Sequence, residues 1–180
     1  MRLEVKAQRL REQRQAVANR PDRSAVIRAL SERFAAILGD FGYPKLSGAL
    51  IDDQLMPQVR GLNYSAASSG GLVLISLAYH LAIWELAFER EDAAPGLLVI
   101  DSPQKNLGHA ADQGDPDFAD TRLVENFYRH VQEWLAQDGI GAQLVIIDNS
   151  PPASVEQHVV VHYTRDPEVP PYGLITDAVE

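Results

Sequence analysis

LLVID, residues 97–101, is the stretch that decides the fold class, because four apolar residues lead without a break into Asp101. A continuous apolar run of this length is typical of a strand buried on both faces of a sheet. QLVIID, residues 143–148, repeats the pattern. The β-branched run within Gln157–Tyr163 predicts a third strand.

Segments with helical periodicity lie between and before these strands. Leu123–Leu135 has apolar residues spaced by three and four, and residues 24–39 show the same spacing after Ser24, the predicted N-cap. Leu72–Arg90 is apolar almost all round, which predicts a helix buried in the core. Residues 41–65 are read as short strands and turns. We therefore expect an α/β domain with a mainly parallel sheet, covered by helices on both faces.

Composition narrows the functional classes. The chain has 180 residues, no cysteine and a formal net charge of −9. Disulfides, thiolate metal sites and cysteine nucleophiles are therefore excluded, and a cytoplasmic location is expected. Residues 1–33 hold nine Arg/Lys against four Asp/Glu, whereas the remainder is strongly acidic. An acidic body argues against a broad nucleic-acid surface on this part of the chain.

Residues 1–23 are rich in Arg, Gln, Glu and Ala, with few large apolar residues. A helix of this composition lacks a packing face of its own, so we expect a helical arm or the end of a coiled coil. The segment Pro21–Ser24 separates this arm from residues 24–180, which we expect to form one lobe. The basic arm could contact phosphate groups, and a solvated charged face is the simpler alternative.

Two features could carry chemistry. Asp101 ends a predicted buried strand, and ligands of open parallel sheets lie at the carboxyl ends of strands. Such a carboxylate can hold hydrated Mg²⁺, or it can simply cap a turn. Ser68–Gly71 opens the long apolar helix, where free N–H groups could bind phosphate. The alternative is that the two glycines only make a tight entrance to that helix.

The order of these pieces resembles the C-terminal half of SMC-like ABC ATPases, the family of chromosome-maintenance and break-repair proteins. A Ser-Gly-Gly loop, a helix, the LLVID strand, SPQKNLG (102–108), a helix and the QLVIID strand follow one another. In that family the order is signature loop, helix, Walker B strand, D-loop, helix and a strand ending at the switch. The resemblance covers about residues 24–165 and implies a P-loop NTPase fold.

The resemblance also implies roles for individual residues. Ser69, Gly70 and Gly71 would form the signature that contacts the γ-phosphate of ATP held by a second subunit. Asp101 would be the Walker B carboxylate that organises Mg²⁺ and water, and Ser102 stands at the catalytic position beside it. Asn106 falls in the D-loop, near Pro103. Asn149, or Asp148 beside it, would occupy the switch.

Several positions depart from the family pattern. Leu72 stands where the signature has Gln or Glu, Ser102 where the catalytic Glu is usual, and Gly108 where the D-loop has Asp. No histidine occupies the switch. These departures suggest slow hydrolysis, a base supplied from elsewhere or an ATP-gated clamp, since serine is no general base near neutral pH.

The chain contains no Gly-x-x-x-x-Gly-Lys-Ser/Thr loop, and its only lysines are Lys6, Lys45 and Lys105. Tight ATP binding by this chain alone is therefore not expected. The resemblance implies an N-terminal Walker A lobe, from the same gene or a split partner, a homodimer of heads, and action on DNA through the complete protein. It implies no membrane partner.

Two other functional classes stay open. One is a non-catalytic, ATP-gated or protein-interaction module that kept the fold and lost turnover, which Ser102 and Gly108 favour. The other is a metal nuclease using Asp101 and Asp148 at neighbouring strand ends. His158 and His162 would lie about 13 Å apart along a strand, too far to share a metal. His80 is read as a core residue, and Asp115–Asp117 as a solvated acidic loop.

Overall fold

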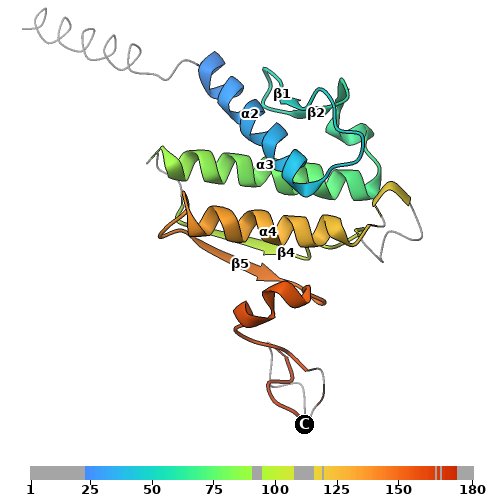
Figure 1. The fold of residues 1–180 in the computed structure, drawn as a ribbon, viewed down its shortest axis with the longest axis vertical. Helices are drawn as coiled ribbons and strands as arrows, with labels where there is room; N and C mark the ends of the chain where they lie inside the picture. Colours follow the sequence, from blue (N-terminus) through green and yellow to red (C-terminus); the bar gives the residue numbers. More distant parts are fainter. Residues whose placement is uncertain are drawn as a thin grey trace, which may run out of the picture. The chain divides into compact units, whose positions relative to one another are not determined.

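A computed structural model describes residues 23–90, 95–107, 116–118, 120–164, 166 and 168–173. The chain divides into two compact units, residues 1–148 and 149–180. The predicted arm, residues 1–23, lies outside the described residues apart from Arg23, as does Gly108 of the predicted D-loop. Figure 1 shows the elements of both units.

Three helices form the centre of the first unit. They are α2 (Arg23–Phe41), α3 (Ser69–Glu89) and α4 (Arg122–Ala136), so all three predicted helices are confirmed. α2 packs against both α3 and α4. Phe34, Phe41 and Phe127 are among the largest fully buried side chains, and the core is built around them. The T-shaped packing of Phe41 on Phe127 joins α2 to α4.

α3 differs from its prediction in two ways. It begins at Ser69, so the residues predicted as an entrance loop form its first turn. It is also only partly buried, since Leu72 and Ile83 are exposed on one side. His80 is exposed as well, and the prediction that it is a core residue is wrong. Its Nδ1 lies 2.7 Å from the carbonyl oxygen of Ser76, so the ring is satisfied locally.

By length and composition, α3 is apolar enough to cross a membrane, and half of its most apolar stretch is buried inside the structure. Partial burial against neighbouring helices is the expected behaviour of a core helix. The sequence prediction of a core helix therefore describes α3 better than a membrane span.

The segment between α2 and α3 forms a small antiparallel sheet, as its short apolar pieces predict. It contains β1 (Leu50–Ile51), β2 (Pro57–Val59) and β3 (Leu62–Asn63), followed by the 3₁₀ helix η1 (Tyr64–Ala66). Ser31 of α2 holds this sheet, because its Oγ accepts a 2.9 Å hydrogen bond from the amide of Ile51.

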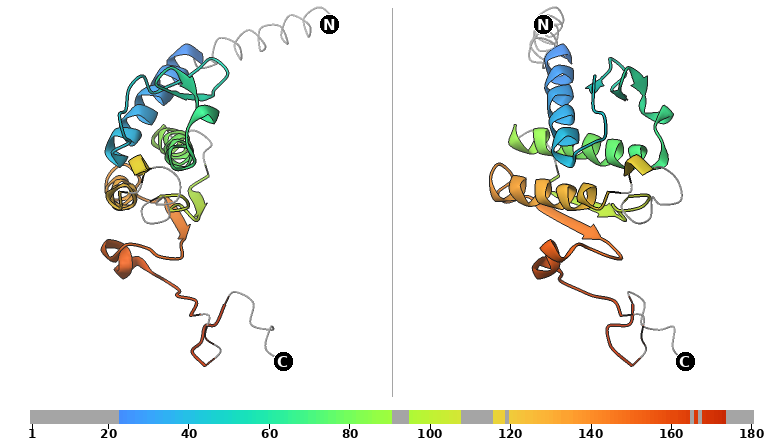
Figure 2. Two further views of the ribbon diagram at one scale, coloured as in Figure 1. Left: turned by 90° about the vertical axis from the view of Figure 1, so that its right-hand side faces the viewer. Right: turned by 45° about the vertical axis from the view of Figure 1, so that its right-hand side comes forward.

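The parallel pair consists of β4 (Leu97–Asp101) and β5 (Gln143–Ile147), with Val99 opposite Val145 and Asp101 opposite Ile147. α4 runs alongside both strands (Figures 1 and 2). The fold is therefore mixed α/β, and the predicted parallel pairing is confirmed for these two strands.

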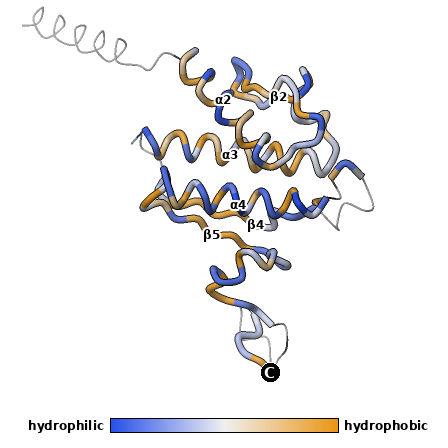
Figure 3. Tube along the Cα trace, in the orientation of Figure 1, coloured by the Kyte–Doolittle hydropathy of each residue, from blue (hydrophilic) through white to orange (hydrophobic). Residues whose placement is uncertain are grey.

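The prediction that helices cover both faces of the sheet is wrong for the described residues. Leu97, Val99, Val145 and Ile147 share one face of the pair and are between 47% and 55% exposed. Figure 3 shows the apolar character of both strands. A parallel sheet is ordinarily covered on both sides, because its strands are apolar on both sides. This uncovered apolar face is unusual for such a sheet.

The second unit contains the 3₁₀ helix η4 (Ala153–His158), with Pro152 at its N-cap position. The predicted strand over Gln157–Tyr163 does not form. Its first residues belong to η4, and no strand in the described chain pairs with the remainder. Val160 is 95% exposed. β-Branched residues favour strands only where a neighbour supplies hydrogen bonds and packing, so composition alone misled the prediction.

Candidate functional site

Asp101 is the last residue of β4 and is exposed at the carboxyl end of the parallel pair. The amide of Ser102 donates to the carbonyl oxygen of Ile147 at 2.8 Å, which prolongs the pairing by one residue. Ser102 then adopts a left-handed conformation with φ of 56°. Its Oγ donates to Asp101 Oδ1 at 2.9 Å. The strand end and the turn after it thus hold Asp101 and Ser102 together.

The loop after β4 is fixed by its own turns. The amide of Lys105 donates to the carbonyl of Ser102 at 3.1 Å, and that of Leu107 donates to Gln104 at 2.9 Å. Pro103 and Leu107 are buried and anchor the loop against the core. Asn106 has φ of 65°, a conformation that asparagine tolerates better than most residues. Residues 102–107 therefore form an ordered turn.

Asp148 braces this loop from the end of β5. Its Oδ2 accepts hydrogen bonds from Gln104 Nε2 at 2.6 Å and from the Tyr128 hydroxyl at 2.5 Å. Burial and the hydrogen bond to Asp148 raise the pKa of Tyr128 well above its usual value, so this hydroxyl stays a donor. These bonds give Asp148 a structural role at the very position where the nuclease alternative needs a metal ligand.

The predicted signature residues split into two groups. Ser69 is exposed, whereas Gly70 and Gly71 are buried. A Cβ added at Gly70 would lie 2.6 Å from Phe118 Cβ and 2.9 Å from the carbonyl oxygen of Asn106. Packing therefore requires glycine at position 70, which agrees with the alternative that the two glycines make a tight entrance to the helix. The same packing brings the first turn of α3 against the predicted D-loop residue Asn106.

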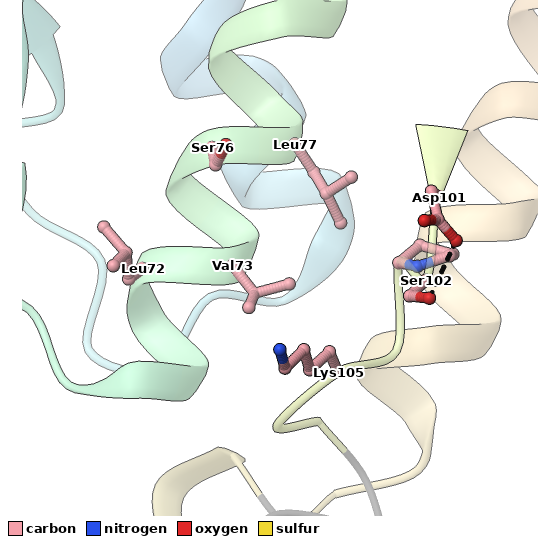
Figure 4. Close-up of a pocket in the computed structure, with 8 residues that line it drawn as sticks. Leu72, Val73, Ser76, Leu77, Asp101, Ser102 and Lys105 are labelled. Atoms are coloured by element: carbon pink, nitrogen blue, oxygen red, sulfur yellow. Dashed lines mark hydrogen bonds between the residues drawn. The ribbon is translucent and has the colours of Figure 1, made fainter. Parts of the chain in front are cut away.

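An open cavity of about 450 Å³ lies between α3 and the loop after β4. Figure 4 shows the residues around it. α3 contributes an apolar wall broken by one hydroxyl, and the strand end contributes a carboxylate, a hydroxyl and an ammonium group. The lining residues are Leu72, Val73, Ser76, Leu77, Asp101, Ser102, Pro103 and Lys105. Asp101 and Ser102 are thus brought together at a cavity, whereas Ser69, Gly70 and Gly71 do not line it.

Asn149, the predicted switch residue, is exposed and belongs to the second unit. Within the described residues, no group of three or more His, Cys, Asp or Glu is arranged to hold a metal ion. Mg²⁺ needs only one or two carboxylates when phosphate oxygens and water complete its shell. The exposed carboxylate of Asp101 is thus one candidate Mg²⁺ ligand, and by itself it makes no metal centre.

A buried ionic cluster was not predicted from the sequence. Its centre is Glu85 of α3, which is only 1% exposed. Glu85 accepts one hydrogen bond from Arg33 of α2 at 2.8 Å, and His130 Nε2 of α4 lies 2.9 Å from its other oxygen. Arg33 also forms a forked pair with Glu89. The signal was present, because a lone glutamate inside an apolar helix needs a charged partner.

The charge states of this ionic cluster follow from its contacts. Burial lowers the pKa of His130, but the hydrogen bonds to Glu85 and Asp40 outweigh that effect and raise it overall. Burial likewise raises the pKa of Glu89, and the bonds from Arg33 and Trp134 reverse the shift. The ionic cluster holds α2, α3 and α4 together through charged hydrogen bonds. It lies away from the cavity and lines no part of it.

No protein-family model matches the chain, and no curated protein matches it.

Proposed function

We propose that this chain is the C-terminal lobe of an SMC-like ABC ATPase, which binds and hydrolyses ATP between two heads. The observation that carries the proposal is the arrangement around the cavity. A carboxylate at the end of a parallel strand faces a helix that begins with Ser-Gly-Gly, and the loop after the strand packs against the first turn of that helix. This is the order of parts that the sequence resemblance implies.

The uncovered face of β4 and β5 supports the proposal that a second lobe completes this sheet. Two parallel strands with one exposed apolar face make an incomplete sheet by the standards of α/β proteins. A Walker A lobe would supply further strands and the phosphate-cradling loop that this sequence lacks. The cofactors of the complete protein would be ATP and Mg²⁺, with Asp101 as the carboxylate toward the metal.

Within this proposal, the residues of the chain position the metal-binding carboxylate and the loop after β4, and they do not transfer protons. Asp101 is positioned by the hydrogen bond from Ser102, and Asp148 keeps the loop after β4 in place through Gln104. Ser102 stands where a general base would be expected, and a serine hydroxyl does not serve that role near neutral pH. We therefore expect slow hydrolysis, with head pairing as the main consequence of ATP binding.

Partners and location follow from the same proposal. Two heads would pair as a homodimer around ATP, and DNA would be contacted through the complete protein, in the cytoplasm. The 21 acidic residues after position 33 argue against DNA binding by this lobe's own surface.

The test is ATP-dependent pairing of the complete protein, which is this chain with the segment or partner that carries Walker A. Ser69→Arg should abolish the pairing, because Ser69 is exposed at the start of α3 and a large cation there would block a second head. Ser47→Arg is the control, since Ser47 is also an exposed serine but lies outside α3, in the segment before β1. Analytical ultracentrifugation with and without ATP measures the outcome. Unchanged pairing of Ser69→Arg would refute the signature assignment.

Ser102 favours a second candidate function, a non-catalytic module gated by ATP. Its hydroxyl donates to Asp101 instead of presenting a carboxylate to water. The two candidates differ in one measurement. A complete protein that pairs on ATP and releases no phosphate above background over many hours would establish the module, and measurable release that is lost in Asp101→Asn would establish the ATPase.

A further inference from the structure

Lys105 is placed differently from the other described lysine. Lys45 forms an ion pair with Asp117 at 2.7 Å. Lys105 has no hydrogen-bond or ion-pair partner for its amino group among the residues that the structure describes. Its backbone is nevertheless fixed, because its amide donates to Ser102 and the neighbouring Pro103 is buried. The loop thus fixes the backbone from which the Lys105 side chain extends, and the described residues leave its charge unpaired.

The side chain of Lys105 lines the cavity. Figure 4 shows its amino group directed toward the start of α3, away from Asp101. The wall on that side is formed by Leu72, Val73 and Ser76, none of which carries a charge. No anionic side chain among the described residues pairs with this ammonium group, so an anion that enters the cavity would give it charge-assisted hydrogen bonds. Asp101, on the opposite side, can face a cation.

We propose that Lys105 is the residue that contacts the terminal phosphate of a polyphosphate ligand in this cavity. The inference rests on the proposed function and adds a residue to it. The carboxylate of Asp101 then faces the metal of a magnesium–polyphosphate complex, and Lys105 faces the phosphate oxygens. An ammonium group stabilises phosphate charge electrostatically, which is a contribution that the neutral serine at position 102 cannot make.

A direct test uses the 180-residue chain and magnesium tripolyphosphate, followed by the NMR amide shifts of Val73, Ser76 and Ser102. These amides report on the cavity, so binding of the probe to the basic N-terminal residues is separated from binding at Lys105. Lys105→Met should weaken the binding about tenfold or more, as expected for loss of a charged hydrogen bond. Lys105→Arg should retain most of it, and Lys45→Met, which removes an exposed lysine elsewhere, should leave it unchanged.

The outcomes separate this inference from the proposed function. Cavity amides that do not shift, or that shift equally in Lys105→Met, would overturn the role of Lys105. If the shifts require Lys105 and the complete protein nevertheless does not pair on ATP, the phosphate site stands and the ATPase assignment fails. If the complete protein pairs on ATP and Lys105→Met pairs with the same ATP midpoint, the assignment stands and Lys105 has no part in it. Lys105 is exposed, so far-UV circular dichroism should show unaltered folding of each variant.

Discussion

Arg33→Met should destabilise the protein strongly, because it removes the positive charge between two glutamates. Arg33 Nη1 lies 2.8 Å from Glu85 and Nη2 lies 2.6 Å from Glu89, and Glu85 is only 1% exposed. Removing one partner of a fully buried ion pair costs about 3–5 kcal/mol, since the other charge is left uncompensated. Arg33 and Glu89 are themselves 25% and 22% exposed, so solvent screening reduces the expected loss to about 2–4 kcal/mol.

The measurement is urea unfolding of the chain at pH 7, followed by circular dichroism. With a slope of about 2 kcal/mol per molar urea, the midpoint of Arg33→Met should fall by about 1–2 M. Arg122→Met is the matched control. Arg122 forms an equally short pair with Asp120, at 2.5 Å, but its side chain is 79% exposed, so the midpoint should barely move.

A second substitution tests the mechanism. If the loss comes from the buried charge of Glu85, which keeps only His130 as its partner, then Glu85→Gln should cost much less in the Arg33→Met background than in the wild type. The coupling in this double-mutant cycle should reach about 1 kcal/mol or more, as for residues in direct contact. Equal midpoints for Arg33→Met and Arg122→Met, or strictly additive effects of Arg33→Met and Glu85→Gln, would refute the reasoning.

His130, Gly70 and Val99 each allow a separate test of the packing described above. The pKa of His130 is raised in the folded state, so protonated His130 contributes fully to the unfolding free energy below pH 6.5. This contribution is lost as pH rises through the folded pKa. The urea midpoint should therefore fall over that pH range in the wild type, and fall less in His130→Phe. Gly70→Ala should lower the unfolding free energy by about 1–3 kcal/mol, because the new methyl group overlaps Phe118 Cβ and Cγ, and calorimetry should show that it costs less in a Phe118→Gly background, which lacks both atoms, than in the wild type. Val99→Lys should leave the thermal midpoint of the isolated chain nearly unchanged, since the side chain is already half exposed, and should prevent co-purification with a Walker A lobe.

The helices and the parallel pair could be predicted because their signals are local. The spacing within Arg122–Ala136 and the apolar run of LLVID each act over a few residues. The third predicted strand failed for the opposite reason. Val159–Val161 have the composition of a strand, but a strand requires a neighbour, and the sequence of one segment does not say whether a neighbour is present.

The candidate site was predictable only in part. The place of Asp101 at the end of β4 follows from the strand pattern, whereas the cavity beside it does not. The packing demand at Gly70 was not predictable, because it arises from Phe118, 48 positions away in the sequence. The partners of Glu85 come from two other helices, so its isolated position in an apolar helix indicated a partner without identifying it.

The uncovered face of β4 and β5 links the failed prediction of a doubly covered sheet to the proposed function. The sequence of both strands is apolar at every position between their ends, as in strands that are buried on both sides. The structure covers only one of those sides, with Val99 and Val145 half exposed on the other. Alternation of polar and apolar residues would be expected if that face were solvated in the working protein. The strand sequences thus fit a larger sheet better than the two-stranded sheet that this chain forms by itself. Val99→Lys distinguishes these cases, because a lysine is tolerated on a solvated face and not on a face that another lobe covers.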